Sequence, residues 1–270
     1  MKPASFDYVR AASVQEAVDR AVEAGGEARF LAGGQSLIPA LNLRLDRPQL
    51  LIDLNAIPGL SSVRQDGDWL VIGAMTRHAI VAQDALIARH LPLLAQAVRE
   101  VAHPAIRNRG TIGGSLALAD PAAEMPACAI ALRAVIRVEG PLGPREIAAD
   151  DFFLGTYATA LEPGELLTEV RFPLPDPTAR HGFAEIARRK GDYATVGLAM
   201  MTGPQGRVVW FGLSDRALRD RAAEAALDDG SARSCALLQG LDVWGDLHTK
   251  AETKCHLAAV LFRRVLGAMA

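Results

Sequence analysis

Hydrophobic residues recur at helical spacing close to the start of the chain. The apolar positions over residues 14–22 form one stripe, which consists of Val14, Ala17, Val18, Ala21 and Val22. Ser13 and Glu16 stand three residues apart where this stripe begins, and that is the spacing of a capping box. The glycine pair at 25–26 follows the stripe and is typical of a helix end. The pattern therefore predicts an amphipathic helix that begins after Ser13.

Two short apolar runs come next, at residues 28–31 and 50–54, and both are typical of β-strands. Between them, residues 36–43 have the pattern of a short helix. The N-terminus of this helix would point at the glycine-containing segment 32–35. These elements predict a compact β-α-β-like opening in which a ligand binds at the start of the helix.

The middle of the chain alternates between strand-like and helix-like patterns. Strands are predicted at 69–72, 135–138 and 166–172, and helices at 91–101 and 124–133. Proline then recurs at alternate positions in the segment Pro-Leu-Pro-Asp-Pro, residues 173–177. Such a segment interrupts regular structure and predicts a domain boundary, so that a first domain would occupy residues 1–172.

Strand-like patterns come before helix-like patterns in the remaining part of the chain. Strands are predicted at 183–188, 195–201 and 208–213, and helices at 217–227, 233–238 and 253–269. An arrangement of strands followed by helices favours a small α+β domain over residues 178–270. The predicted fold class of the whole chain is therefore α+β.

Composition excludes several classes of protein. The 270 residues are half apolar, which is enough for a sizeable core, and the formal net charge is −2. A chain without basic excess is not expected to bind nucleic acid. The sequence contains no apolar run long enough for a transmembrane helix, and its first residues lack the apolar core of a signal peptide. We therefore expect a cytoplasmic protein.

The residue types that carry metal and nucleophile chemistry are sparse. Cys128, Cys235 and Cys255 lie far apart without a C-x-x-C motif, and the six histidines show no metal-binding spacing. We therefore expect reduced thiols and neither a zinc site nor an iron–sulfur cluster on this chain. No catalytic triad or paired-carboxylate arrangement is visible, so we predict no catalytic side chains, and chemistry would belong to a cofactor.

Two glycine-containing segments are the strongest candidates for a cofactor site. Residues 32–37 read Ala-Gly-Gly-Gln-Ser-Leu, and residues 111–115 read Thr-Ile-Gly-Gly-Ser. Paired glycines followed by a hydroxyl residue suit a phosphate, because backbone N–H groups and a hydroxyl can share one oxyanion. Two such segments could hold the two phosphates of a dinucleotide. Neither matches the Rossmann fingerprint or the P-loop.

Four motifs in a fixed order make the candidate far more specific. They are A-G-G-Q-S-L at 32–37, I-R-N-R-G-T-I-G-G-S-L-A at 106–117, D-P-A-A-E-M-P-A at 120–127 and R-R-K-G-D-Y-A-T-V at 188–196. Together they resemble the FAD-binding medium subunit of the molybdenum hydroxylases, the xanthine oxidase family, in its carbon monoxide dehydrogenase form. The resemblance spans nearly the whole chain. It implies a two-lobed FAD-binding domain of the vanillyl-alcohol-oxidase-like (PCMH) type, with lobes at about 1–55 and 56–172, and a small C-terminal domain.

The resemblance also implies which residues hold FAD. The pyrophosphate would bind between the lobes, with one wall formed by Leu31, Ala32, Gly33, Gly34, Gln35, Ser36 and Leu37 and the other by Thr111, Ile112, Gly113, Gly114 and Ser115. Gln35 stands where the family often has His, and Ser115 where it usually has Asn; both keep a hydrogen-bonding side chain. Leu167, in the predicted strand 166–172, is also included among the cofactor-binding candidates.

Two further groups of side chains are assigned through the resemblance. Glu124, where the family usually has Asp, would bind the adenosine ribose, with Asp120 as a nearby alternative. Tyr193 would cover one face of the isoalloxazine, and Lys190 or Arg188 would stabilise the reduced, anionic flavin. Without the resemblance, the segment around Lys190 is typical of a solvated turn and Glu124 of a helix first turn.

The function implied is electron transfer by a flavoprotein subunit. A large partner subunit would hold the molybdenum cofactor and the substrate, and a small partner would hold two [2Fe–2S] clusters, in a dimer of heterotrimers. Electrons would pass through the clusters to FAD on this chain and then to an external acceptor. Two alternatives remain open: a stand-alone FAD oxidase, and a non-catalytic interaction subunit that has lost FAD.

Overall fold

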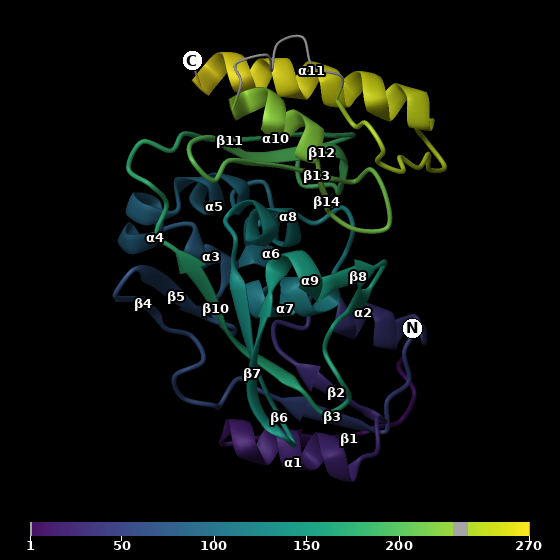
Figure 1. Ribbon diagram of the computed structural model, residues 1–270. Coiled ribbons are helices and arrows are strands. Elements are labelled where there is room, and N and C mark those ends of the chain that lie inside the picture. The colour runs from purple at the N-terminus through teal and green to yellow at the C-terminus, as the bar shows by residue number, and fades with distance from the viewer. Residues whose placement is uncertain (1, 229–236, 270) are drawn as a thin grey trace.

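The computed structural model describes residues 2–228 and 237–269, and Figure 1 shows their arrangement in layers. A small sheet with helix α1 lies at one end of the molecule. A second sheet and a group of short helices occupy the middle, and a third sheet covered by α10 and α11 lies at the other end. Helices and strands contribute in similar measure, so the predicted α+β class is confirmed.

The N-terminal sheet contains one strand that the sequence patterns missed. Strands β1 (Asp7–Arg10) and β2 (Ala28–Leu31) both pair in parallel with the central strand β3 (Leu50–Asp53). Strand β1 has no buried residue, and this explains why its sequence shows no apolar alternation. Helix α1 (Val14–Glu23) and the short helix α2 (Leu37–Asn42) confirm the two predicted helices of this lobe.

The predicted cap of α1 forms with one difference. The Oγ atom of Ser13 accepts a hydrogen bond of 3.1 Å from the N–H of Glu16, as a capping box requires. The Glu16 carboxylate accepts from the N–H of Ala12, at 2.8 Å, and not from that of Ser13. Both hydrogen bonds of a capping box are therefore formed, but the Glu16 carboxylate binds one residue closer to the N-terminus than in the standard motif.

The middle of the molecule is built on a five-stranded antiparallel sheet of order β4-β5-β10-β6-β7. Its strands are β4 (Val63–Asp66), β5 (Trp69–Gly73), β6 (Val135–Gly140), β7 (Gly143–Ala148) and β10 (Leu166–Pro173). The edge strands β4 and β7 were not predicted, because their residues are mostly exposed and polar. The strands predicted at 69–72, 135–138 and 166–172 are confirmed as β5, β6 and β10.

Short helices and a two-stranded ribbon pack around this sheet. They are α3 (His78–Val81), α4 (Ala85–His90), α5 (Pro92–Ala97), α6 (Pro104–Arg107), α7 (Ile112–Leu118), α8 (Glu124–Ala131), α9 (Ala149–Phe152), β8 (Phe153–Gly155) and β9 (Ala158–Thr159). Helix α5 ends four residues before the predicted limit of 101. Helix α7 is a correction, because no helix was predicted over residues 112–118 and the second glycine segment forms its first turn.

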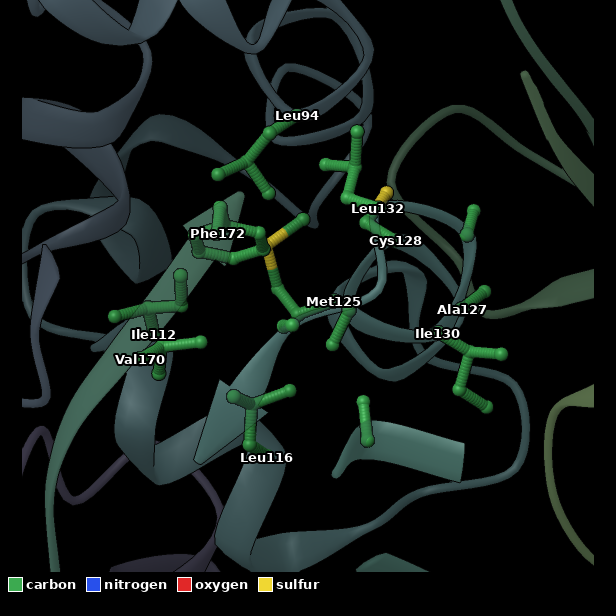
Figure 2. Close-up of a cluster of buried hydrophobic side chains, with 14 of the residues drawn as sticks. Leu94, Ile112, Leu116, Met125, Ala127, Cys128, Ile130, Leu132, Val170 and Phe172 are labelled. Carbon is green, nitrogen blue, oxygen red and sulfur yellow. The ribbon is translucent and has the colours of Figure 1, made fainter. Parts of the chain in front are cut away.

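The core of this part is centred on helix α8, which is apolar on nearly all sides. Figure 2 shows its Met125 and Cys128 among buried side chains from α5, α7 and β10. Such a helix is hydrophobic all round because neighbouring elements surround it. The predicted helix 124–133 is thus confirmed, and its first residue, Glu124, is carried at the edge of the core.

The C-terminal part has a four-stranded antiparallel sheet, β11-β12-β13-β14, packed against helix α11 (Ala251–Met269). The strands are β11 (His181–Ala187), β12 (Ala194–Met201), β13 (Arg207–Phe211) and β14 (Leu218–Arg219). The helix predicted at 217–227 begins later, as α10 (Arg221–Asp228), because residues 218–219 pair with β13. Of the helix predicted at 233–238, residues 233–236 lie outside the described residues and 237–238 form a turn.

Both faces of this third sheet are buried, in two different cores. Along β12, Leu198 and Met200 pack toward α11, whereas Ala199 and Met201 pack toward the middle of the molecule. Trp210 and Phe211 divide in the same way on β13. Strand residues alternate between faces with a period of two, so one sheet can join two cores. The inner face of the C-terminal sheet therefore belongs to the same core as helix α8 and the middle sheet.

Candidate functional site

The first glycine segment carries a run of backbone donors without protein acceptors. None of the N–H groups of residues 32–37 has a hydrogen-bond acceptor within the described part of the chain. The segment lies between the end of β2 and the start of α2, where the Ser36 hydroxyl makes no capping bond. The Gln35 side chain turns back and donates to the carbonyl oxygen of Gly33 at 3.1 Å. Such a run of free amides suits an anion.

Glycine is required at both central positions of this segment. Gly34 has a φ of +73°, in the left-handed region, and a Cβ atom there would stand 3.0 Å from Ile38. A Cβ atom on Gly33 would lie 2.3 Å from the carbonyl oxygen of Arg109. The main chain before the second glycine segment therefore touches the first segment directly.

The second glycine segment is organised differently from the expectation. The N–H groups of Ile112 and Gly113 donate to the carbonyl oxygens of Thr76 and Ala74, at 3.0 and 2.9 Å. Those of Gly114 and Ser115 donate to Oγ1 and the carbonyl oxygen of Thr111, both at 3.0 Å. The expected array of free amides is therefore absent at residues 112–115, because they start a capped helix. The donors of this segment without an acceptor in the described part of the chain are the N–H and the hydroxyl hydrogen of Thr111 and the side chain of Ser115.

Gly113 and Gly114 still have separate steric roles. A Cβ atom on Gly113 would stand 2.5 Å from that of Ala74, so this glycine permits α7 to pack on the sheet. A Cβ atom on Gly114 would lie 2.8 Å from Oγ1 of Thr111 and 3.7 Å from Cβ of Ala32. Gly114 thus faces the first segment, and the two predicted walls are brought together.

A cavity of about 460 Å³ lies at this junction. It is lined by residues 32–35 of the first segment together with Leu31, Ile38, Pro39, Asp53, Asn55 and Arg109. Ser36 and Leu37 lie beside it and do not line it. Sequence reasoning missed Asn55 and Arg109; Arg109 stands within the second quoted motif, where its charge was a usable signal. The Arg109 guanidinium makes no ion pair among the described residues, so a cation is available at the cavity.

Asp120 lies at the opposite end of α7 from the glycine pair. Its Oδ1 accepts from the N–H of Ala122 at 2.9 Å, and its Oδ2 accepts from the Tyr157 hydroxyl at 3.3 Å. Burial raises the pKa of Asp120 above its usual value. Ala119 and Tyr157, on either side of this carboxyl, both have left-handed φ angles of about +53° and +54°. Non-glycine residues adopt that region rarely, and such residues cluster at functional sites.

Three further carboxyl groups come together here from different elements. Glu124 begins α8, Glu185 lies on β11, and Glu100 follows α5. Burial, with the charges of Asp120 and Glu100, raises the pKa of Glu124 to about 7. Burial, with the charges of Glu124 and Glu100, raises the pKa of Glu185 to about 8. In the described ranges, none of these groups is paired with a cation within 4.0 Å.

The loop between β11 and β12 reaches this acidic group from the C-terminal part. Tyr193 is 66% exposed, yet partial burial of its hydroxyl and the charges of Asp120 and Glu124 raise its pKa to about 12. Gly191 has a φ of +86° and would clash with His103 if it carried a Cβ atom. Lys190 is exposed to solvent. The charges of Asp120 and Glu124 therefore act on Tyr193, whereas Lys190 lies at the exposed surface of the same loop.

Leu167 has a different environment from the other candidates. It lies on β10, is 4% exposed and belongs to the apolar core of the middle layer. The carbonyl oxygen of its neighbour Thr168 accepts a hydrogen bond from the N–H of Ala74. The carbonyl oxygen of Ala74 in turn accepts from the N–H of Gly113. The side chain of Leu167 thus supports the sheet behind α7, and a cofactor contact of this residue stays a prediction.

Comparison with known proteins identifies the family. A family model described as the FAD binding domain in molybdopterin dehydrogenase matches residues 4–175. The chain belongs to this family. It is 39% identical to the 6-hydroxypseudooxynicotine dehydrogenase complex subunit alpha of Paenarthrobacter nicotinovorans, covering 99% of this chain and 95% of that protein. It is 40% identical to the carbon monoxide dehydrogenase medium chain of Afipia carboxidovorans, covering 98% and 97%.

Solved structures give the same result for this member of the molybdopterin dehydrogenase FAD-binding family. A chain of the carbon monoxide dehydrogenase from Hydrogenophaga pseudoflava superposes with a TM-score of 0.93 at 38% identity, covering 100% of this chain and 98% of that one. The predicted recognition of the family from four motifs is therefore confirmed.

The site has features that fit an FAD-binding family. Free amides at residues 32–37 and the Arg109 cation suit a pyrophosphate, and the glycine positions keep that space clear of side chains. Tyr193 offers an exposed aromatic ring at the other end of α7. Within residues 2–228 and 237–269, no group of His, Cys, Asp and Glu side chains could hold a metal ion. No helix of those ranges is long and apolar enough to cross a membrane.

Proposed function

We propose that this chain is the FAD-carrying, electron-transfer subunit of a molybdenum-dependent dehydrogenase. The observation that carries the proposal is the run of free amides at residues 32–37, of which residues 32–35 line a cavity beside Arg109, in a member of an FAD-binding family. The relatives that it matches nearly end to end are medium chains or subunits of dehydrogenase complexes. FAD supplies the redox chemistry when bound, and the chain binds and orients it.

The pyrophosphate is assigned to the cavity beside the first segment. Residues 32–37 would donate N–H groups to its oxygens, and the Arg109 guanidinium would offset its charge. The second segment would contribute its side-chain hydroxyls and the close approach allowed by Gly114, since the amides of residues 112–115 already have acceptors. This division of labour between the segments replaces the symmetrical arrangement expected from the sequence.

The flavin is assigned to the end of α7 where Tyr193 lies. Helix α7 has seven residues and so spans roughly 10 Å at 1.5 Å per residue. This span separates the pyrophosphate cavity from the group formed by Tyr193, Asp120 and Glu124. Because the charge of Glu124 acts on Tyr193, binding of the adenosine ribose by Glu124 would require that ribose to lie near the flavin end. We therefore favour Asp120 and Glu124 as groups that face the flavin side of the site.

The proposed electron-transfer role also implies partner subunits and a cellular location. A large subunit would carry the molybdenum cofactor and a small one two [2Fe–2S] clusters, in a dimer of heterotrimers in the cytoplasm. Within the chain, residues 1–172 form the FAD-binding domain, with lobes at about 1–55 and 56–172, and residues 178–270 form the C-terminal domain. The family model ends at residue 175, inside the proline-containing segment that separates them.

The cofactor is tested by extracting it from the purified full-length chain and identifying it by chromatography. We expect FAD, with a flavin absorption spectrum, because only a dinucleotide has a pyrophosphate to match the cavity. FMN alone would contradict the dinucleotide assignment. A chain that takes up no flavin, alone or within its native complex, would favour the interaction subunit that has lost FAD.

The partners are tested by purifying a tagged copy of the chain from its own cells. Two further subunits that contain molybdenum, iron and acid-labile sulfide should co-purify in equal amounts. A flavin-loaded chain that oxidises a substrate without any partner would instead favour the stand-alone oxidase.

A further inference from the structure

The Arg77 side chain crosses between the two lobes beside the proposed FAD cavity. Arg77 stands at the N-cap of α3, with an extended backbone. Its Nη1 donates to the carbonyl oxygen of Arg109, directly before the second glycine segment. Its Nη2 donates to Oδ1 of Asn55, at the end of the N-terminal lobe. One guanidinium therefore bonds to main chain on one side of the junction and to a side chain on the other.

Asn55 extends this connection to the first glycine segment. Its Nδ2 atom donates to the carbonyl oxygen of Ala32 at 3.0 Å. The backbone N–H of Asn55 donates to Oδ1 of Asp53 at 2.8 Å, which holds the side chain in place at the end of β3. The path Ala32, Asn55, Arg77, Arg109 thus links the two segments that line the cavity, and each step is a hydrogen bond.

The position of this path explains how two lobes keep their separation. Gly33 touches the main chain of Arg109, so the segments cannot move closer. The Arg77 path opposes their moving apart. Arg77 is half-buried, and burial together with the charge of Arg109 lowers its pKa. A desolvated cation at this place costs free energy, and its two charge-assisted hydrogen bonds offset that cost.

We propose that Arg77 is a positioning residue that holds the two glycine segments at the spacing FAD requires. The proposal rests on the proposed function, since it concerns the same cavity. Two acceptors on opposite lobes call for the planar fork of a guanidinium, and the single ammonium of a lysine cannot reproduce it. A preformed cavity binds FAD more tightly, because no free energy is spent on ordering the two lobes when FAD binds.

The test compares FAD affinity and unfolding in four single variants and one double variant of the full-length chain, after removal of flavin. Arg77→Lys keeps the charge but not the fork, Arg77→Met removes both, and Asn55→Ala removes the acceptor on the N-terminal lobe. Arg64→Lys is the matched control, because Arg64 forms an ion pair of 2.7 Å with Glu169 on the sheet and makes no contact across the junction.

We expect the dissociation constant for FAD to rise about tenfold or more in Arg77→Lys and in Asn55→Ala, with the melting temperature of the flavin-free chain kept. The Arg77→Lys/Asn55→Ala double variant should lose no more than the worse single variant, because both belong to one path. Arg64→Lys should bind FAD as the wild type does.

Wild-type affinity in Arg77→Lys would overturn the positioning role and leave only a charge effect. A wild-type chain that binds no FAD would instead overturn the proposed function. Arg77→Met separates the positioning role from the charge effect. If the guanidinium geometry matters, its FAD affinity should match that of Arg77→Lys.

Discussion

Gly33 lies so close to the main chain of Arg109 that a Cβ atom on residue 33 would stand 2.3 Å from the Arg109 carbonyl oxygen. The two glycine segments therefore meet backbone to backbone beside the proposed cofactor site. Backbone atoms cannot rotate away as a flexible side chain can, so the contact sets the geometry of the cavity on that side.

Gly33→Ala should accordingly open the junction. We expect a loss of roughly 1–3 kcal/mol in the free energy of unfolding, which is typical of an overpacked site, together with reduced FAD content. Denaturant unfolding and the ratio of flavin to protein measure the two effects. Gly267→Ala is the control: residue 267 lies in α11, a Cβ atom there would meet no other part of the described chain within 4 Å, and alanine favours a helix. Full flavin content in Gly33→Ala would show that the contact does not shape the site.

Gly114→Val should abolish or strongly weaken FAD binding. The added Cβ would lie 2.8 Å from Oγ1 of Thr111, displacing the hydroxyl that caps α7 at a cost of about 1 kcal/mol, and its methyl groups would approach Ala32. Circular dichroism should report a folded chain while flavin content falls. Thr111→Ser, which keeps the capping hydroxyl, should retain flavin. If Gly114→Val holds a full complement of FAD, the second segment does not border the pyrophosphate.

Tyr193→Ala should change the reactivity of the flavin without affecting substrate oxidation by the partner subunit. Loss of the ring removes a stacking face worth on the order of 1 kcal/mol and admits water to that side. Stopped-flow spectroscopy of the complex should show normal bleaching of the iron–sulfur centres and altered flavin reduction or reoxidation. Tyr193→Phe keeps the ring and should resemble the wild type. Unaltered flavin kinetics in Tyr193→Ala would place this residue away from the isoalloxazine.

Stability should fall as pH rises from about 5 to about 8. Glu124 and Glu185 have folded-state pKa values of about 7 and about 8, above the ordinary glutamate value. The folded chain therefore holds protons that the unfolded chain has already released, and the free energy of unfolding decreases with pH across that window. Urea unfolding at several pH values measures the slope.

Glu185→Gln should reduce that slope, since it removes a group that must be desolvated and charged at high pH. Glu23→Gln is the control, because Glu23 is a surface residue of α1 whose side chain is 66% exposed. An equal slope in wild type and Glu185→Gln would mean that Glu185 keeps an ordinary pKa in the folded chain.

Elements with strong apolar periodicity could be predicted from the sequence, and elements without it could not. Helix α1 and strand β10 carry clear patterns because one or both faces are buried. Strands β1, β4 and β7 form through main-chain pairing at sheet edges, where side chains stay exposed and carry no pattern. Helix α7 was missed because its glycines, which packing against Ala74 requires, are typical of loops.

The sequence by itself determined the family, the cofactor class and the stretches from which the site is built, because four motifs in order are specific and their residue types suit a dinucleotide. Only the tertiary structure decided that residues 32–37 keep free amides while residues 112–115 do not. It alone joined Arg77 to Asn55 and gathered Glu100, Glu124 and Glu185 from separate elements. Hydrogen-bond pairing and desolvation depend on which distant groups surround an atom, and the local sequence does not contain that information.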